Sequence, residues 1–206
     1  IRKVRRKLNK PVAIMLDTKG PEIRTGNFNV DEIFLKPGDV FTLTTRDVEG
    51  SQDIVSVSYE GLPNDVEVGS NIYIDDGLVQ LEVIEIKDGT DVTCKAINNG
   101  VLSDHKGVNL PGRQTNLPSL TPKDIDDIKF GIENDIDLIA ASFVRKKEDV
   151  YDIRRVLEDH GGEHIKIFSK IESQEGVDNL EEIIEASDGI MIARGDLGIE
   201  IRTELI

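Results

Sequence analysis

The chain has 206 residues and a formal net charge of −15, and 38% of its residues are hydrophobic, enough for a folded core. The acidic balance argues against a nucleic-acid partner, because phosphate binding requires clustered lysine and arginine. No apolar run reaches the roughly 18 residues of a membrane span, and the single cysteine excludes an intrachain disulfide. We therefore expect a cytoplasmic protein.

The first predicted element is a short helix over residues 1–10, in which Ile1, Val4 and Leu8 recur at helical spacing. Its basic residues indicate a solvated helix face, which we favour over a polyanion-binding tail. The run "PVAIMLD" at 11–17 is unbroken and apolar, as in a parallel strand that is buried on both faces. Because the chain opens within a helix and without Met, we expect it to be a fragment.

A second block, at about residues 21–118, is predicted to be β structure throughout. Its alternating segments are separated by the turn sequences "KPGD", "GLPND", "DDG" and "DGTD". The segments are Val40–Thr45, Asn71–Ile74, Leu78–Ile86 and Val92–Ile97. Hairpins joined by tight turns favour a small antiparallel barrel or sandwich, with Cys94 as a core residue.

In the third block, strands and helices alternate. Thr121 followed by Pro122 is a helix start, because Thr caps free amides and Pro is tolerated at the first helical position. Strands are predicted at 136–143, 165–171 and 189–193, and helices at 147–160 and at 177–187, the latter with Leu180, Ile183 and Ile184 facing inward. This order predicts a parallel sheet, so the fold class is α/β with an inserted β domain.

Polar residues end all four predicted parallel strands, where such sheets carry their chemistry. Lys170 and Glu172 follow the third strand, and alternation places them on the same side. Glu172 and Asp196, on neighbouring strand ends, suit Mg²⁺ or Mn²⁺ better than zinc. Gly195 allows close backbone approach by a carboxylate or phosphate, and Lys170 adds positive charge.

This pattern predicts phosphoryl chemistry on a metal-bound anionic substrate. Each feature alone has a simpler structural explanation, because strand ends commonly meet solvent and an aspartate after glycine is more often a turn residue than a ligand. The coincidence of four polar strand ends favours a functional site.

Several stretches, taken together and in order, resemble the pyruvate kinase family. They are "LDTKGPEIRTG" at 16–26, "DDGL" at 75–78, "KGVNLPG" at 106–112, "ASFVRK" at 141–146, "SKIESQEG" at 169–176 and "MIARGDLGIE" at 191–200. The resemblance implies a (β/α)₈ TIM barrel, of which about four strands are present, interrupted by a small β-barrel domain that closes as a lid over the nucleotide. The implied domains are 1–20 and 119–206 for the barrel and 21–118 for the lid.

The family transfers phosphate from phosphoenolpyruvate to ADP, giving pyruvate and ATP, and uses Mg²⁺ or Mn²⁺ with, usually, K⁺. By this resemblance Glu172 and Asp196 are expected to bind the divalent ion, and Lys170 to steady the transferring phosphoryl group. Asp17 and Thr18 resemble part of the K⁺ site.

The resemblance also assigns substrate and nucleotide contacts. The backbone at Gly195 and Asp196 resembles the cradle for the substrate carboxylate, and Ser142 and Phe143 match the floor near the substrate methylene. Arg24 resembles an arginine near the phosphates, and three positions resemble the nucleotide side: Pro21, Asp76 and Lys106.

The sequence departs from the family pattern at Arg202, where a proline is usual. The resemblance implies a homotetrameric parent. Because the family's upstream segment, later barrel strands and C-terminal domain are absent from this sequence, we expect the isolated chain to be inactive. Two alternatives stay open at this point. One is a non-catalytic nucleotide-binding or interaction module. The other is a different phosphoenolpyruvate-using barrel, which the inserted β block disfavours.

Overall fold

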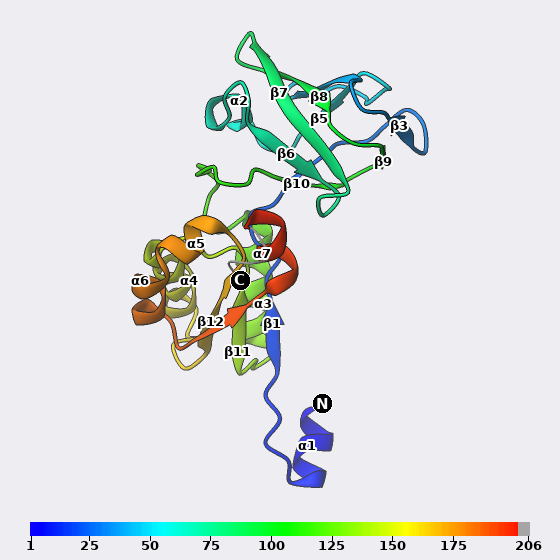
Figure 1. Cartoon of the computed structure of the whole chain (residues 1–206). Helices are drawn as coiled ribbons and strands as arrows, with labels where there is room; N and C mark the ends of the chain where they lie inside the picture. Colours follow the sequence, from blue (N-terminus) through cyan, green and yellow to red (C-terminus); the bar gives the residue numbers. More distant parts are fainter. Residues whose placement is uncertain (202–206) are drawn as a thin grey trace. The chain divides into compact units, whose positions relative to one another are not determined.

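The computed structural model describes residues 1–201 and divides the chain into two compact units (Figure 1). The first unit comprises Ile1–Pro21 and Pro118–Ala193, and the second comprises Glu22–Leu117 together with the residues from Arg194 onward. The assignment of domains within the parent protein stays a prediction.

The first unit is built on a four-stranded parallel sheet in the order β1-β11-β12-β13. These strands are Met15–Asp17, Leu138–Ala141, Lys166–Ile171 and Gly189–Ile192. Three helices alternate with them along the chain: α3 (Pro122–Glu133), α4 (Lys147–Asp159) and α6 (Leu180–Ala186). The α/β fold class is therefore confirmed, and the sheet corresponds to half of a (β/α)₈ barrel.

The helices cover the sheet through one apolar cluster, in which Ile128 of α3, Leu157 of α4 and Ile183 of α6 are fully buried. Helix α3 begins as predicted, because the Thr121 side chain accepts from the Asp124 amide and the Asp124 side chain accepts from the Thr121 amide. Figure 1 shows α4 and α6 together on one side of the sheet.

Three details of the first unit differ from the sequence-based expectation. Strand β1 is short and its residue Met15 is exposed, since β1 is an edge strand among residues 1–201. The helix expected at 177–187 is two helices, α5 (Gln174–Asp178) and α6, because Ser173 caps the chain earlier by accepting from the Gly176 amide. Ile184 is exposed rather than inward-facing. Helix α1 (Arg2–Leu8) formed as expected and buries none of its residues.

The second unit contains a seven-stranded sheet in the order β2-β10-β6-β7-β8-β4-β5. In that order the strands are Ile23–Arg24, Gly107–Asn109, Asn71–Ile74, Val79–Lys87, Asp91–Ala96, Val40–Thr44 and Ile54–Ser56. A bridge between Thr25 and Val57 joins the two ends of the order, so the sheet closes into a barrel. One strand pair departs from the expected antiparallel arrangement, because β4 and β5 pair in parallel.

The remaining elements of the second unit are short. They are β3 (Ile33–Leu35), which pairs with β9 (Gly100–Leu102), and the helices α2 (Leu62–Asp65) and α7 (Arg194–Glu200). Helix α7 was not predicted; Asn109 of β10 donates a hydrogen bond to its residue Glu200 at 3.1 Å. Cys94 is a fully buried core residue, and burial raises the pKa of its thiol to about 12.

Two leucines of the second unit, one buried in the barrel core and one exposed, allow a stability prediction. Leu81 is fully buried and Leu78 is 66% exposed. We expect Leu81→Ala to lower the free energy of unfolding of this unit by about 2–5 kcal/mol, because it leaves a cavity in the core. Leu78→Ala should change it by less than about 0.5 kcal/mol. Urea titration of both variants tests this, and equal losses would contradict the assigned burial of Leu81 in the core.

Candidate active site

The carboxyl ends of β1, β11 and β12 bring together a lysine, two carboxylates and a serine. Because the strands are parallel and in register, residues far apart in sequence meet at one edge of the sheet. Lys170 Nζ lies 3.0 Å from Glu172 Oε1 and 3.4 Å from Asp17 Oδ1. We call Asp17, Ser142, Lys170 and Glu172 the strand-end cluster.

Ser142 links the cluster to the loop that follows β1. Its hydroxyl donates to the Thr18 carbonyl oxygen at 2.6 Å and accepts from Lys170 Nζ at 3.0 Å. Its amide donates to the Thr18 hydroxyl oxygen at 3.1 Å. Thr18 and Ser142 are both buried, so these hydrogen bonds are shielded from water and fix the ends of β1 and β11 against each other.

Glu172 is held by the backbone at the end of the neighbouring strand β11. Its side chain is 1% exposed, and its Oε2 accepts a hydrogen bond of 2.6 Å from the Phe143 amide. Phe143 has a φ of +54°, a left-handed conformation that is uncommon for a bulky residue and costs about 1–3 kcal/mol. Such strain persists where surrounding contacts determine the backbone, and here the Phe143 N–H is directed at a buried carboxylate.

Lys170 is the positive member of the strand-end cluster. Partial burial acts to lower the pKa of its ammonium group, but the hydrogen bond to Glu172 and the charges of Glu172 and Asp17 outweigh burial. The pKa of Lys170 is therefore raised above its ordinary value of 10.5. The lysine is charged at neutral pH, and its ammonium group faces Asp17, Ser142 and Glu172.

The oxygen ligands of the cluster suit a hard divalent cation. Glu172 presents two carboxylate oxygens, of which Oε2 binds the Phe143 amide and Oε1 pairs with Lys170. Residues 1–201 contain no group of three or more His, Cys, Asp or Glu arranged to hold a metal. Magnesium is commonly bound by one or two carboxylates, with substrate and water supplying the other oxygens, so the donor set fits such an ion.

The second predicted metal ligand lies in a different part of the chain. Gly195 and Asp196 are in the first turn of α7, which belongs to the second unit, whereas Glu172 belongs to the first. Their convergence on one ion stays a prediction. Among the described residues, no atom lies within 4 Å of a Cβ placed at Gly195, so internal packing does not require glycine there. Arg202 lies outside the described residues.

In the second unit, Arg24, the predicted arginine near the phosphates, lies next to Lys106, one of the three predicted nucleotide-side residues. Arg24 pairs with Gly107 across β2 and β10, next to Lys106. Arg24 donates to Glu22 at 2.6 Å and to the His105 carbonyl oxygen at 2.7 Å. Lys106 forms an ion pair of 3.1 Å with Asp75. This gives one end of the barrel two cations whose positions are set by neighbouring acceptors.

The other two predicted nucleotide-side residues are Asp76 and Pro21. Asp76 is exposed in the turn after β6 and has a φ of +54°. Pro21 belongs to the first unit and ends its first segment, Ile1–Pro21.

Sequence reasoning missed two hydrogen-bonding roles in this site. It assigned Phe143 and Thr18 to ligands, whereas the Phe143 amide binds Glu172 and the Thr18 hydroxyl and carbonyl bind Ser142. The signal for Thr18 was its place beside Asp17 at a strand end. No sequence signal marks the left-handed conformation of Phe143, since phenylalanine carries no preference for it.

The parallel half-barrel with a charged cluster at its carboxyl edge places the chain among (β/α)₈-barrel proteins. A family model described as pyruvate kinase, barrel domain, matches residues 1–206. The chain belongs to the pyruvate kinase family.

Three curated relatives carry the name pyruvate kinase. The protein of Staphylococcus epidermidis strain RP62A is 55% identical over 207 residues, which cover 100% of this chain and 35% of that protein. The Clostridium acetobutylicum protein is 55% identical, covering 98% of this chain and 42% of that protein. The Bacillus licheniformis protein is 52% identical, covering 99% and 35%. The chain therefore spans about 35–42% of the length of these relatives.

The raised pKa of Lys170 predicts a pH-dependent contribution to stability. Because the folded-state pKa exceeds the unfolded value, the ion pairs of Lys170 stabilise the fold fully below pH 10.5 and lose their effect as pH rises through the folded-state pKa. The difference in free energy of unfolding between wild type and Lys170→Met should therefore stay constant below pH 10.5 and shrink as the pH rises above this value. Urea titrations across this range measure it.

Lys129→Met provides the control, because Lys129 is 3.8 Å from the exposed Asp126 and outside the strand-end cluster. Its effect should be small at every pH. A Lys170→Met difference that does not shrink at any pH above 10.5 would show that the Lys170 ion pairs do not stabilise the fold.

Proposed function

We propose that the protein containing this chain transfers the phosphoryl group of phosphoenolpyruvate to ADP, giving pyruvate and ATP. The strand-end cluster carries the proposal, since Lys170 lies between two carboxylates at the edge where barrel proteins bind substrates. Membership of the pyruvate kinase family and the names of the relatives support it.

In this proposal Lys170 places its positive charge beside the oxygens of the transferring phosphoryl group. Phosphoryl transfer depends on positioning and on electrostatic stabilisation of charge that spreads over these oxygens. Asp17, Ser142 and Glu172 hold the ammonium group in place before substrate binds. Preorganised charge of this kind is not lost to solvent reorganisation during the reaction.

Glu172 and Asp196 would hold Mg²⁺ or Mn²⁺, and Asp17 and Thr18 would contribute oxygens to a K⁺ site. The divalent ion, when bound, supplies positive charge that offsets charge on the leaving enolate oxygen. The Phe143 amide keeps the Glu172 carboxylate oriented. Asp17 is the most exposed member of the strand-end cluster, with 61% of its side chain accessible, so it retains oxygen lone pairs for a cation.

Substrate and nucleotide would be held by the remaining predicted residues. The amides at Gly195 and Asp196, in the first turn of α7, would bind the substrate carboxylate, and Ser142 and Phe143 would lie near the substrate methylene. Arg24 and Lys106 supply positive charge for ADP phosphates. The last two predicted residues would line the nucleotide side: Pro21 and Asp76.

The cellular setting and assembly belong to the same proposal. No helix within residues 1–201 has the length and apolar character to cross a membrane. We propose a cytoplasmic glycolytic enzyme that assembles as a homotetramer, with contacts contributed largely by parts of the parent outside this chain.

The metal assignment is tested by Glu172→Gln in the full-length parent. We expect Mg²⁺-dependent transfer to fall by about a thousandfold or more, because the neutral amide binds a divalent cation weakly. In addition, the amide has only one acceptor oxygen, whereas the Phe143 amide and Lys170 each need one. Pyruvate formation with coupled lactate dehydrogenase measures this. Glu185→Gln, an exposed residue of α6, is the matched control and should retain wild-type activity. Undiminished turnover of Glu172→Gln would remove Glu172 from the metal site.

A second test concerns this chain by itself. We expect no measurable transfer by the isolated 206-residue chain, because the parallel sheet of its described residues has β1 and β13 as edges, with Ile192 60% exposed. The coupled assay measures turnover, and titration with ADP, with and without Mg²⁺, measures binding. ADP saturation without turnover would match a chain that retains only nucleotide binding, whereas turnover at the rate of the parent would contradict the expected inactivity.

A further inference from the structure

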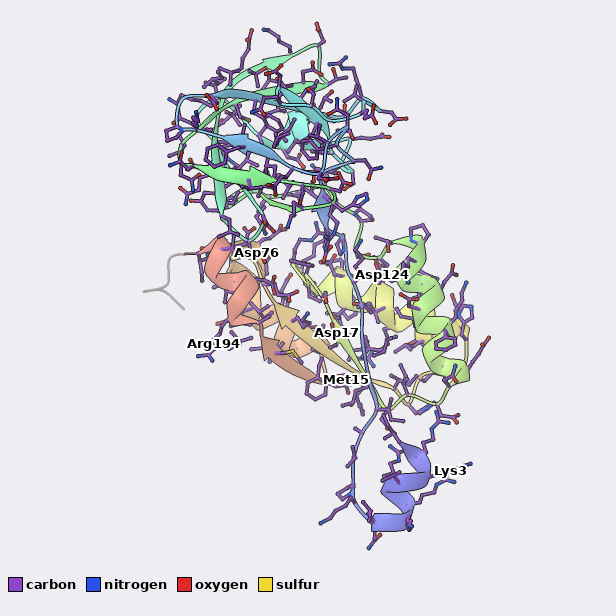
Figure 2. The ribbon with its side chains drawn as sticks, turned by 90° about the vertical axis from the view of Figure 1, so that its right-hand side faces the viewer. Lys3, Met15, Asp17, Asp76, Asp124 and Arg194 are labelled. Atoms are coloured by element: carbon purple, nitrogen blue, oxygen red, sulfur yellow. The ribbon has the colours of Figure 1, made fainter. Side chains whose placement is uncertain are left out.

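Asp124 is a buried carboxylate outside the proposed catalytic machinery. It lies in the first turn of α3 and has no exposed surface (Figure 2). Its Oδ2 accepts hydrogen bonds from the Thr121 amide at 2.9 Å and the Thr121 hydroxyl at 2.5 Å. Its Oδ1 accepts from the Gly20 amide at 3.1 Å, across a sequence separation of 104 residues.

Asp124 Oδ1 binds the Gly20 amide, a contact that capping of helix α3 does not require. In a capping box, one acceptor on the third helical residue satisfies the backbone amide of the N-cap residue, and Asp124 Oδ2 already does so for Thr121. Burying a carboxylate away from water is costly unless its oxygens are hydrogen-bonded. The Gly20 amide therefore completes the site of Asp124, and Asp124 in turn restrains Gly20.

Gly20 ends the loop of residues 17–20, which contains Asp17 and Thr18. A Cβ placed at Gly20 would lie 2.9 Å from the Ser142 Cβ, and the φ of Gly20 is +73°, so the loop is closely packed and requires glycine at this position. Thr18 is bound to Ser142 at one end of the loop. Asp124 binds the other end, so the loop is fixed at both ends.

We infer that Asp124 is a positioning residue for the strand-end cluster: it holds the loop of residues 17–20 so that the Asp17 carboxylate stays beside Lys170. Asp17 Oδ1 lies 3.4 Å from Lys170 Nζ and 3.3 Å from the Ser142 hydroxyl. Release of Gly20 would free the backbone three residues from this contact. The catalytic consequence rests on the proposed function, whereas the restraint of the loop does not.

The experiment compares Asp124→Ala, Thr121→Ala and Asp126→Ala in the full-length parent. Asp124→Ala removes both the cap and the Gly20 contact. Thr121→Ala removes the cap hydroxyl and leaves the Gly20 contact, and Asp126→Ala alters an exposed carboxylate of the same helix. Three readouts are taken: thermal unfolding, amide hydrogen exchange in peptides covering residues 17–21, and kcat with KM for ADP.

For Asp124→Ala we expect about tenfold faster exchange in residues 17–21 and about a tenfold lower kcat, with KM for ADP unchanged, as for the loss of one charge-assisted hydrogen bond. Thr121→Ala should lower the unfolding temperature while leaving exchange and kcat at wild-type values. Asp126→Ala should change none of the three. Asp124→Asn keeps an oxygen for the Gly20 amide and should recover part of the lost kcat.

If Asp124→Ala and Thr121→Ala lower the unfolding temperature equally and neither changes exchange nor kcat, Asp124 is only a helix cap and the inference is overturned. If Asp124→Ala does not fold, the wild-type parent decides, because a Gly20 amide that exchanges as fast as an unprotected amide would also overturn the inference. A wild-type parent without phosphoenolpyruvate-dependent activity would refute the proposed function alone, and the exchange comparison would still test the restraint of the loop.

Discussion

The burial of the Glu172 carboxylate is the constraint on which the candidate site depends. An unpaired charge of this kind is strongly destabilising, so the surrounding chain must supply a counter-charge and hydrogen-bond donors. Lys170 supplies the charge from the same strand, and the Phe143 amide supplies the donor from the neighbouring strand end. The left-handed backbone at Phe143 follows from this requirement, because its local strain is offset by a hydrogen bond to a buried ionised group.

The same constraint explains why polar residues accumulate at one edge of an otherwise apolar sheet. Lys170 forms an ion pair with Glu172 and also approaches Asp17 and Ser142, which come from the ends of two other strands. Parallel register makes this convergence possible, since β11 lies between β1 and β12 and its carboxyl end faces both. The network is thus a property of the sheet and not of any one loop.

Sequence reasoning predicted the features that depend on local signals, namely the alternation of side chains along a strand and a helix cap. It failed for features that depend on contacts with segments distant in sequence. Alternation placed Lys170 and Glu172 on one side of β12, and the Thr121–Pro122 pair marked the start of α3. The exposure of β1, the parallel pairing of β4 with β5 and the conformation of Phe143 depend on partners distant in sequence. Periodicity contains no information on which strand lies beside another, so these features could not be predicted.

The net charge of the strand-end cluster determines which charge a bound ligand must carry. Lys170 faces two carboxylates, so the cluster as a whole is negative and would repel an anionic substrate by itself. An anion can therefore approach Lys170 favourably only when a cation offsets the carboxylate charge, and the exposed oxygens of Asp17 can contact such a cation. The requirement for metal ions in the proposed phosphoryl transfer thus follows from the same buried acid that orders the site.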